Sequence, residues 1–395
     1  MIITREITPR LIELSKQFPV IAIMGPRQSG KTTLSRQTFP DYAYVTLEDI
    51  DTKIGAKEDP RRFLATYARY KGVIIDEIQE VPELFSYMQG IVDQEYKPGF
   101  FIITGSQNFL MYEKITQTLA GRIALLTLLP LTVNELKNAA LLPQTLEEVL
   151  FKGFYPRLYA QPFDLKIWFS NYIATYVEKD VRQVLNVSDI ISFQKFLRLC
   201  AARVGNLLNY SEIARDCDIS PNTAKAWISV LETSYIIKLL QPYHKNFNKR
   251  ITKSPKLYFY DVGLACSLLG IQSAHELFTH SLRGALFESM TISELFKYYY
   301  NQIMTPNLYF WRDLQGHEVD CIIEKTYNTL IPIEIKAGMT IIPSFFKGII
   351  DWQTISEQKN NAYIIYAGDE NFQRSYGQLI AWKNIKEIFS YEQSS

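Results

Sequence analysis

The chain has 395 residues, of which 47% are hydrophobic and 21% are charged, and its formal net charge is +1. This length predicts two or three domains with a large core, and the 25 tyrosines and 23 phenylalanines argue against disorder. The balanced charge excludes nucleic-acid binding through bulk charge, so any such affinity must come from local basic patches.

The cysteines and histidines are too few and too scattered to indicate a zinc site. No two of the four cysteines form a C-x-x-C pair, and there are only four histidines. We therefore expect a reduced, cytoplasmic protein. The first residues lack the apolar core of a signal peptide, and the longest apolar run, at 123–133, is interrupted and too short to span a bilayer. No membrane partner is expected.

Residues 25–33 fit G-x-x-x-x-G-K-[ST], the pattern of a phosphate-binding loop. An apolar run, 20–24, precedes the loop, and a helix-compatible run follows it, as the motif requires. Glycines let backbone N–H groups face a polyphosphate, and the helix N-terminus adds positive potential. The alternative is a chance glycine-rich turn. The predicted ATP-binding residues are Gly25, Pro26, Arg27, Gln28, Ser29, Gly30, Lys31, Thr32 and Thr33.

Within this loop, Lys31 is expected to contact the β- and γ-phosphates and the Thr32 hydroxyl to bind Mg²⁺. A second motif follows about 45 residues later, where a short buried strand at 73–75 ends in Asp76 and Glu77. We expect Asp76 to hold the Mg²⁺ shell and Glu77 to polarise an attacking water, which predicts ATP hydrolysis. The alternative is a solvated acidic pair that merely ends a strand.

Strand and helix signals alternate through the first 135 residues. The strand at 42–47 lies between the two motifs in the sequence, which indicates an ATPase with an inserted central strand. We therefore expect an α/β P-loop NTPase core with a parallel sheet. The expected strands are 20–24, 42–47, 73–76, 100–104 and 123–128.

Three polar residues outside the two motifs are further candidates. Ser106 follows a strand within the polar stretch 105–108 and is expected to sense the γ-phosphate; the alternative is a turn that caps the next helix. Arg122 precedes the last strand and either reaches the nucleotide of a neighbouring subunit in a homo-oligomer or is a surface arginine. Arg157 follows a helical stretch that would form a lid, and it could contact the phosphates within the same chain.

From residue 190 the pattern changes to three helices, 193–202, 210–216 and 221–231, with Ser220 as a natural N-cap of the third. A strand-like run at 235–240 suits the wing of a winged helix. A basic loop without acidic residues follows it, and this loop suits phosphate contacts with DNA. The alternative is a winged helix that contacts protein or extends the lid. The loop residues are Lys245, Lys249, Arg250, Lys253 and Lys256.

The last third contains a D…E-x-K pattern. Glu334 and Lys336 are two apart on the strand 330–336 and leave the same face, where Asp320 of the strand 318–324 could meet them. Glu288, on an expected amphipathic helix at 283–295, would add a third carboxylate. Such a cluster suits Mg²⁺ or Mn²⁺, with Lys336 orienting a water or offsetting developing charge. The alternatives are a solvated strand face and a nuclease-like core retained for architecture.

Together these motifs resemble a prokaryotic family of AAA+-type ATPases that carry the C-terminal domain called DUF4143. The resemblance implies an ATPase core, a winged helix and a fold like that of the PD-(D/E)xK nucleases. It assigns Lys31, Thr32, Asp76 and Glu77 to ATP, whereas Val319 departs from the proline found in many such nucleases. The nuclease-like site would comprise Glu288, Asp320, Glu334 and Lys336. Besides the phosphate loop, the matching segments are 75–79, 104–106, 119–122, 130–136, 153–156, 176–181, 201–205, 258–264, 287–288 and 311–320.

We expect four regions: an ATPase core, a helical lid, a winged-helix domain and a nuclease-like α/β domain. The leading hypothesis is an ATP-hydrolysing protein that acts on nucleic acid and is coupled to a Mg²⁺-dependent nuclease-like domain. The alternative is a regulatory ATPase switch whose C-terminal half binds protein partners without cleavage. The expected boundaries are 1–135, 136–190, 191–262 and 263–395.

Overall fold

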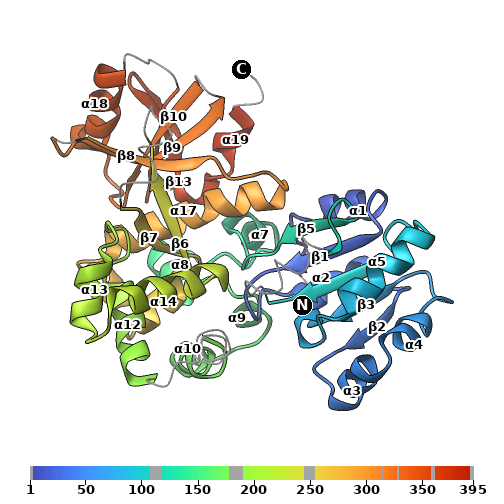
Figure 1. The fold of residues 1–395 in the computed structure, drawn as a ribbon. Coiled ribbons are helices and arrows are strands. Elements are labelled where there is room, and N and C mark those ends of the chain that lie inside the picture. The colour runs from blue at the N-terminus through green and yellow to red at the C-terminus, as the bar shows by residue number, and fades with distance from the viewer. Residues whose placement is uncertain are drawn as a thin grey trace. The chain divides into compact units, whose positions relative to one another are not determined.

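The computed structural model describes residues 3–106, 118–177, 190–243, 254–313, 315–326, 329–356 and 361–391. The chain forms two compact units: the first comprises 1–131 with 233–235 and 300–304, and the second comprises the remaining segments (Figure 1). Some predicted features lie outside the described residues, namely 107–108 of the polar stretch, most of the 176–181 motif, and Lys245, Lys249, Arg250 and Lys253 of the basic loop.

The first unit contains a five-stranded sheet whose order is β2-β3-β4-β1-β5 and whose strand pairs are all parallel. All five strands predicted from the sequence are confirmed. The strand inserted between the phosphate-loop strand β1 and the carboxylate strand β3 is β4, whereas β2, which lies between them in the sequence, is at the edge of the sheet. The bounds are β1 Val20–Met24, β2 Ala43–Thr46, β3 Val73–Asp76, β4 Phe101–Gly105 and β5 Ile123–Thr127.

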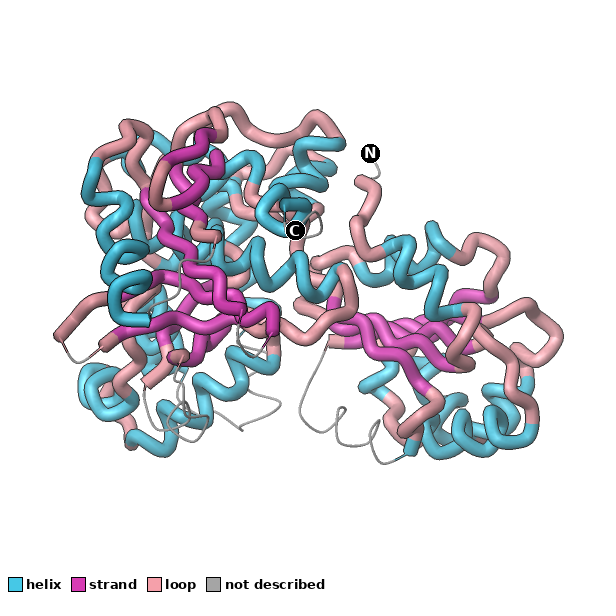
Figure 2. The backbone as a smooth tube through the Cα atoms, turned by 90° about the horizontal axis from the view of Figure 1, so that it is seen from above, coloured by secondary structure: helices cyan, strands magenta, loops and turns pink. Residues whose placement is uncertain are grey.

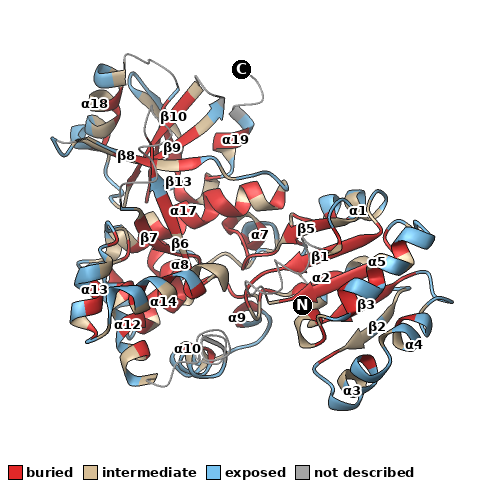
Figure 3. Ribbon diagram, viewed as in Figure 1, coloured by how far each residue is buried: buried red, intermediate tan, exposed pale blue. Residues whose placement is uncertain are grey.

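Both faces of the sheet are buried at its three central strands, β1, β3 and β4, which explains the continuous apolar runs of these strands (Figure 3). Side chains alternate between two cores: Ala22, with its neighbours on β3 and β4, packs on one face, and Ile21 packs on the other. Helices cover both faces (Figure 2). They are α1 Thr8–Ser15, α2 Lys31–Thr38, α3 Ile50–Glu58, α4 Pro60–Ala65, the 3₁₀ turn η1 Ile78–Glu80 and α5 Leu84–Gln94.

The second unit begins with helices, among which the three expected for a helix-turn-helix are confirmed. Ser220 caps the third helix, because its hydroxyl accepts a hydrogen bond from the amide of Thr223 at 3.0 Å. The helices of this part are α7 Val133–Asn138, α8 Leu146–Lys152, α9 Arg157–Ala160, α10 Leu165–Tyr172, the π turn η2 Ile173–Val177, α12 Ile190–Ala202, α13 Tyr210–Asp216 and α14 Pro221–Thr233.

The expected wing strand and the strands that carry Asp320 and Glu334 belong to one eight-stranded sheet, ordered β12-β13-β11-β10-β9-β8-β6-β7. The wing strand β6 pairs with β7 in antiparallel fashion and with β8 in parallel fashion, where Gln241 is opposite Tyr309. The strands are β6 Ile237–Pro242, β7 Lys256–Phe259, β8 Leu308–Arg312, β9 Glu318–Thr326, β10 Thr329–Lys336, β11 Tyr363–Tyr366, β12 Phe372–Arg374 and β13 Gly377–Ala381.

The helix that carries Glu288 is not amphipathic, contrary to the sequence prediction. It is α17 Arg283–Asn301, and from its second turn onward it is buried almost all round. Several of its polar residues have partners inside the fold: Ser289 and Ser293 donate to backbone carbonyl oxygens at 3.0 and 2.7 Å, and Lys297 is 2.8 Å from a Glu294 oxygen. Short polar side chains therefore occupy core positions in this helix.

The second unit contains further helices. They are α16 Val262–Leu268, η3 Ala274–Phe278, η4 Pro343–Phe346, α18 Lys347–Ser356, η5 Trp382–Asn384 and α19 Glu387–Tyr391. Among the residues described, none of the helices combines the length and the apolar character needed to cross a bilayer.

A buried carboxylate joins two of the family motifs. Asp261 caps α16 by accepting from the amide of Leu264 at 3.0 Å, and it also accepts from the amide of Phe154 at 2.6 Å. Gly153 brings the second amide into place with φ 69° and ψ −161°, a backbone region that is essentially restricted to glycine. A Cβ on Gly153 would lie 2.4 Å from an Asp261 oxygen.

We predict that Gly153→Ala destabilises the second unit more than Gly270→Ala. Gly270 also has a positive φ, +75°, but a Cβ there meets nothing within 4 Å. The control should cost about 1 kcal/mol for its left-handed backbone, and Gly153→Ala about 3 kcal/mol or more, because the clash with Asp261 adds to the strain. Denaturant unfolding measures both free energies. Equal losses would mean that the contact with Asp261 is unimportant.

Candidate nucleotide site and carboxylate cluster

The phosphate loop lies at the C-terminal edge of the parallel sheet, between β1 and α2. Gly25 fits because a Cβ there would lie 2.1 Å from the carbonyl oxygen of Leu128, and Gly30 has a φ of +93°. Lys31 is only 6% exposed, and its ammonium donates to the carbonyl oxygens of Gly25 and Pro26 at 3.1 and 2.9 Å. The lysine is therefore held within the loop that would surround a polyphosphate.

Asp76 is buried at the end of β3 and accepts hydrogen bonds from three hydroxyl groups. One of its oxygens accepts from Thr32 at 2.8 Å and from Tyr44 at 3.0 Å, and the other accepts from Thr104. These donors come from α2, β2 and β4, so the sheet order itself brings them to the carboxylate. The direct contact between Thr32 and Asp76 places the two predicted Mg²⁺ ligands next to each other.

Glu77 follows in a left-handed conformation, with φ +56°. The side-chain amide of Gln79 donates to a Glu77 oxygen and also lies 3.3 Å from the hydroxyl of Ser106. Gln79 thus connects the residue expected to polarise water with the residue expected to sense the γ-phosphate. Strain at a non-glycine residue beside such a network is typical of functional positions.

Besides Gln79 and Thr104, two more residues of this site were not predicted from the sequence. Arg5, which is buried, donates to the carbonyl oxygens of Ser29 at 2.7 Å and Leu129 at 2.6 Å, and so ties the phosphate loop to the chain after β5. Tyr44 contacts Asp76, and burial followed by that carboxylate raises the pKa of its phenol to about 12. The sequence could have indicated Tyr44, because this residue alternates with Thr46 on β2. It contains no signal that would have indicated Arg5.

The two candidate arginines occupy different places. Arg122 precedes β5, whose first residue Ile123 pairs with Val20, so it lies at the sheet edge opposite the phosphate loop. Its guanidinium binds both carboxylate oxygens of Asp93 on α5 and remains one-third exposed. Arg157 starts α9 in the second unit, is exposed, and lies 5.5 Å from the centre of the Phe163 ring. Their contacts with nucleotide remain predictions.

The second cluster is built on the antiparallel pair β9 and β10. Ile333 pairs with Cys321, which sets Asp320 opposite Glu334 as expected. An Asp320 oxygen accepts from the amide of Ile335 at 2.7 Å and lies 3.5 Å from the Lys336 ammonium, which also contacts Glu334. The D…E-x-K residues are therefore brought together on one face of the sheet.

Glu288 joins this cluster from α17, and three unpredicted residues come with it. Lys256 lies 3.1 Å from a Glu288 oxygen and 2.5 Å from an oxygen of Glu318, and the hydroxyl of Tyr258 donates to Glu288 at 2.5 Å. Lys256, which we had included in the exposed basic loop, is instead the buried first residue of β7 and is paired with carboxylates. It is therefore not free to contact DNA phosphates.

Burial and repulsion by a neighbouring carboxylate raise the pKa values of Glu288 and Glu334. Burial, followed by the nearby Asp320, raises the pKa of Glu288 to about 7 and that of Glu334 to about 8. Burial lowers the pKa of Lys256 and Lys336, but the surrounding carboxylates outweigh it and raise both pKa values overall. The shared influence of Asp320 shows that the carboxylates interact as one cluster.

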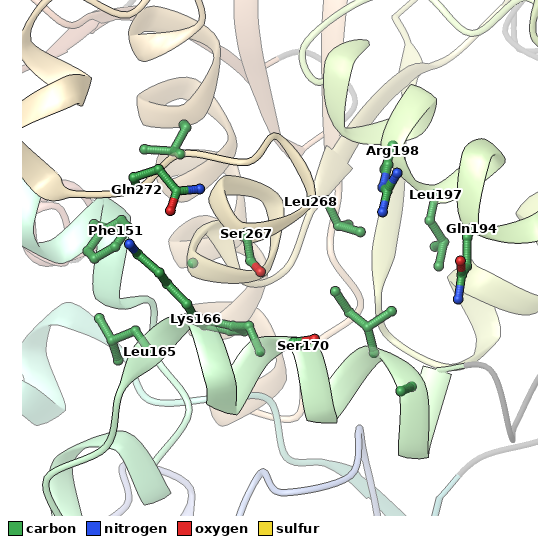
Figure 4. A pocket seen from close by; sticks show the side chains of 15 residues that line it. Phe151, Leu165, Lys166, Ser170, Gln194, Leu197, Arg198, Ser267, Leu268 and Gln272 are labelled. Atoms are coloured by element: carbon green, nitrogen blue, oxygen red, sulfur yellow. The ribbon is translucent and has the colours of Figure 1, made fainter.

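A cavity of 340 Å³ lies elsewhere in the second unit, between α10, α12 and α16 (Figure 4). Its lining includes the apolar side chains of Phe169 and Leu268, while Lys166 and Arg198 come from opposite sides in this view. Its lining includes none of the phosphate-loop or carboxylate-cluster residues. The chemistry of the two candidate sites therefore does not involve this cavity.

Three family models match the chain. Residues 17–137 match an AAA domain, residues 143–275 a domain of unknown function (DUF8612), and residues 283–385 a domain of unknown function (DUF4143). The chain is also 29% identical over 371 residues to uncharacterized proteins of Mycobacterium bovis and Mycobacterium tuberculosis. These alignments cover 93% of this chain and 81% of each relative.

Similar solved structures are more distant. A Walker-type ATPase of Pyrococcus abyssi has a TM-score of 0.47 and 16% identity, covering 68% of this chain and 96% of that one. The Holliday junction branch migration motor RuvB of Thermotoga maritima has a TM-score of 0.33 and 16% identity, covering 60% and 89%. The sequence models therefore agree with the motifs: the chain contains an AAA domain at 17–137 and a C-terminal DUF4143 domain at 283–385.

Proposed function

We propose that this protein binds ATP with Mg²⁺ and hydrolyses it at the C-terminal edge of the five-stranded sheet. The observation that carries the proposal is the hydrogen bond of 2.8 Å between the Thr32 hydroxyl and Asp76, which joins the phosphate loop to the carboxylate strand. A hydroxyl and a carboxylate in contact at the mouth of a phosphate loop are the Mg²⁺ ligands of a P-loop ATPase. The match of residues 17–137 to an AAA domain supports the same activity.

Each residue of the site has a distinct role in this proposal. Mg²⁺, when bound with ATP, supplies charge neutralisation for the β- and γ-phosphates. Thr32 and Asp76 would hold the ion, and Lys31 would exchange its two carbonyl partners for phosphate oxygens. Glu77 would accept a proton from the attacking water, while Gln79 links Glu77 to Ser106.

Hydrolysis should depend on Lys31 and Glu77 in different ways. Lys31→Ala should weaken ATP binding, because it removes the phosphate contacts of the lysine. Glu77→Gln keeps the shape of the side chain and should leave binding intact while slowing hydrolysis by ~10²-fold or more. Nucleotide binding and phosphate release are measured separately for each variant. Equal hydrolysis rates for wild type and Glu77→Gln would refute the role of Glu77 as general base.

We also propose that Arg122 acts on the nucleotide of a neighbouring copy in a homo-oligomer. Activity should then rise with protein concentration, and Arg122→Ala should lower the rate while sparing ATP affinity. Mixing Arg122→Ala with Lys31→Ala protein should restore activity, because each variant supplies what the other lacks. Asp93→Asn is the matched control, since it weakens the ion pair that holds Arg122 and should not lower the rate. Concentration-independent activity, or no rescue in an associated mixture, would indicate a monomeric ATPase.

A second proposed activity is metal-dependent cleavage of nucleic acid at the carboxylate cluster. The donor set fits a hard cation, because Glu334 has one buried oxygen that no donor reaches among the described residues. Gly348 leaves space beside this oxygen, where a Cβ would lie only 2.0 Å away. Across the parts of the chain that the structure describes, no group of three or more His, Cys, Asp and Glu side chains is already arranged to hold a metal ion. Glu288 and Glu334 contact lysines instead.

In this proposal, a bound Mg²⁺ or Mn²⁺ supplies an acidified water and stabilises charge on a scissile phosphate. Asp320 and Glu334 would hold the ion with the carbonyl of Ile335, and Glu288 would be a third or outer carboxylate. Lys336 would orient the water. DNA is the proposed substrate because a helix-turn-helix lies in the same unit. The competing hypothesis is a regulatory ATPase switch whose C-terminal half binds protein partners without cleavage.

We predict that Mn²⁺ stabilises the wild-type protein through this cluster. Binding at a hundredfold excess over the dissociation constant adds about 2.7 kcal/mol to the free energy of unfolding. Asp320→Asn should abolish this gain and any cleavage of DNA or RNA while sparing ATP hydrolysis. Asp369→Asn, which changes an exposed carboxylate paired with Lys383, is the matched control and should behave like wild type. No Mn²⁺ effect and no cleavage in wild type would favour the switch without nuclease activity.

A further inference from the structure

The carboxylate cluster contains a lysine that the D…E-x-K pattern does not include. Lys256 is only 4% exposed, although it directly follows a stretch of the sequence that is rich in lysine and arginine. Its backbone is fixed from two sides. Leu240 of β6 pairs with it, and next to it Leu257 exchanges hydrogen bonds with Gly205 and Asn206 at 2.7 and 3.1 Å. The position of Lys256 within the cluster is therefore fixed by the fold.

The two lysines divide the carboxylates between them. Lys336 contacts Asp320 and Glu334, and Lys256 contacts Glu288 and Glu318. Arg312 also lies 3.5 Å from the second oxygen of Glu318. When all four carboxylates are ionised, they therefore face three positive charges, which leaves a net charge of −1. A divalent cation can join this cluster only if the carboxylate oxygens turn toward it.

Glu288 is held away from such a cation by its present partners. The same oxygen accepts from the Lys256 ammonium and from the Tyr258 hydroxyl. A divalent cation that enters the cluster must either take this oxygen from the ammonium or bind while repelled by it at a distance of a few ångströms. Both routes oppose metal binding, because Coulomb repulsion in a buried site is weakly screened.

We propose that Lys256 is the resident counter-cation of Glu288, and that metal ions bind the cluster only as its ammonium leaves this carboxylate. Lys256 thereby sets the metal affinity of the cluster. The proposal rests on the metal site proposed above and adds a residue from the wing strand β7 to it. It also explains why Glu288 faces a lysine rather than an open space beside Asp320.

The test is binding of Mn²⁺ alone to the full chain, followed by calorimetry and by the shift of the unfolding temperature. Lys256→Met should bind Mn²⁺ about tenfold or more tightly than wild type, because it removes the competing charge. Lys383→Met is the matched control: it makes the same change at a lysine paired with exposed Asp369, and it should leave affinity unchanged. Adding Asp320→Asn to Lys256→Met should abolish the gain, which assigns the bound ion to this cluster.

Glu318 provides a second variant in case the buried carboxylates unfold Lys256→Met protein. Lys256→Met combined with Glu318→Gln removes one charge of each sign and should also bind more tightly than wild type. Affinity equal to or below that of wild type in both variants would overturn the proposal and leave Lys256 as a structural ion pair. Binding by the variants but not by wild type would support it in its strongest form. No Mn²⁺ binding by any of these proteins would instead overturn the metal site itself.

Discussion

Parallel pairing of β4 with both β1 and β3 is the constraint on which the nucleotide site depends. It aligns the C-terminal ends of these strands at one edge, so the phosphate loop after Met24 and the carboxylate of Asp76 lie on either side of the Thr104 side chain. The ends of parallel strands in an open sheet are where ligands bind. The same alignment positions Lys31, Glu77 and Ser106 at this edge, because each of these residues follows one of the three strands.

The carboxylate of Asp76 and the carboxylate cluster around Asp320 are stabilised in different ways. Asp76 accepts from three hydroxyl groups, which are neutral donors and can turn toward other partners at little cost. The cluster around Asp320 is balanced by two ammonium groups, of which that of Lys256 is buried and that of Lys336 is partly buried. Breaking such an ion pair leaves an uncompensated charge in a poorly solvated site. The first arrangement therefore favours exchange of ligands, whereas the second resists it until another cation arrives.

The sequence predicted most of the elements because their signals are local. The strands β1 to β5 are apolar runs with clear ends, and Ser220-Pro221 marks a helix start that the structure confirms. The meeting of Asp320 with Lys336 followed from strand alternation and one antiparallel pairing. These inferences needed only residues within one element or in two adjacent elements.

The missed features depend on contacts between distant segments. Arg5 contacts a carbonyl group 124 positions away, and nothing near it in the sequence marks that partner. Lys256 looked like a loop residue because lysine and arginine precede it, yet its carboxylate partners come from α17 and β9. The segment of α17 was expected to form an amphipathic helix, although backbone carbonyl groups accept from its serine hydroxyls inside the core. Tertiary context decides the role of a polar residue in each case.

The junction between β6 and β8 has a consequence for how the C-terminal region can be isolated. This pairing continues the carboxylate sheet into the wing hairpin. A fragment that starts at residue 263 would lack both wing strands and would expose β8 as a new sheet edge. Open edges promote association between chains. Such a fragment would also lose Lys256 and Tyr258, so its carboxylates would differ in charge from those of the intact protein. A fragment that is meant to keep the sheet and the carboxylate cluster intact must therefore retain residues 237–259.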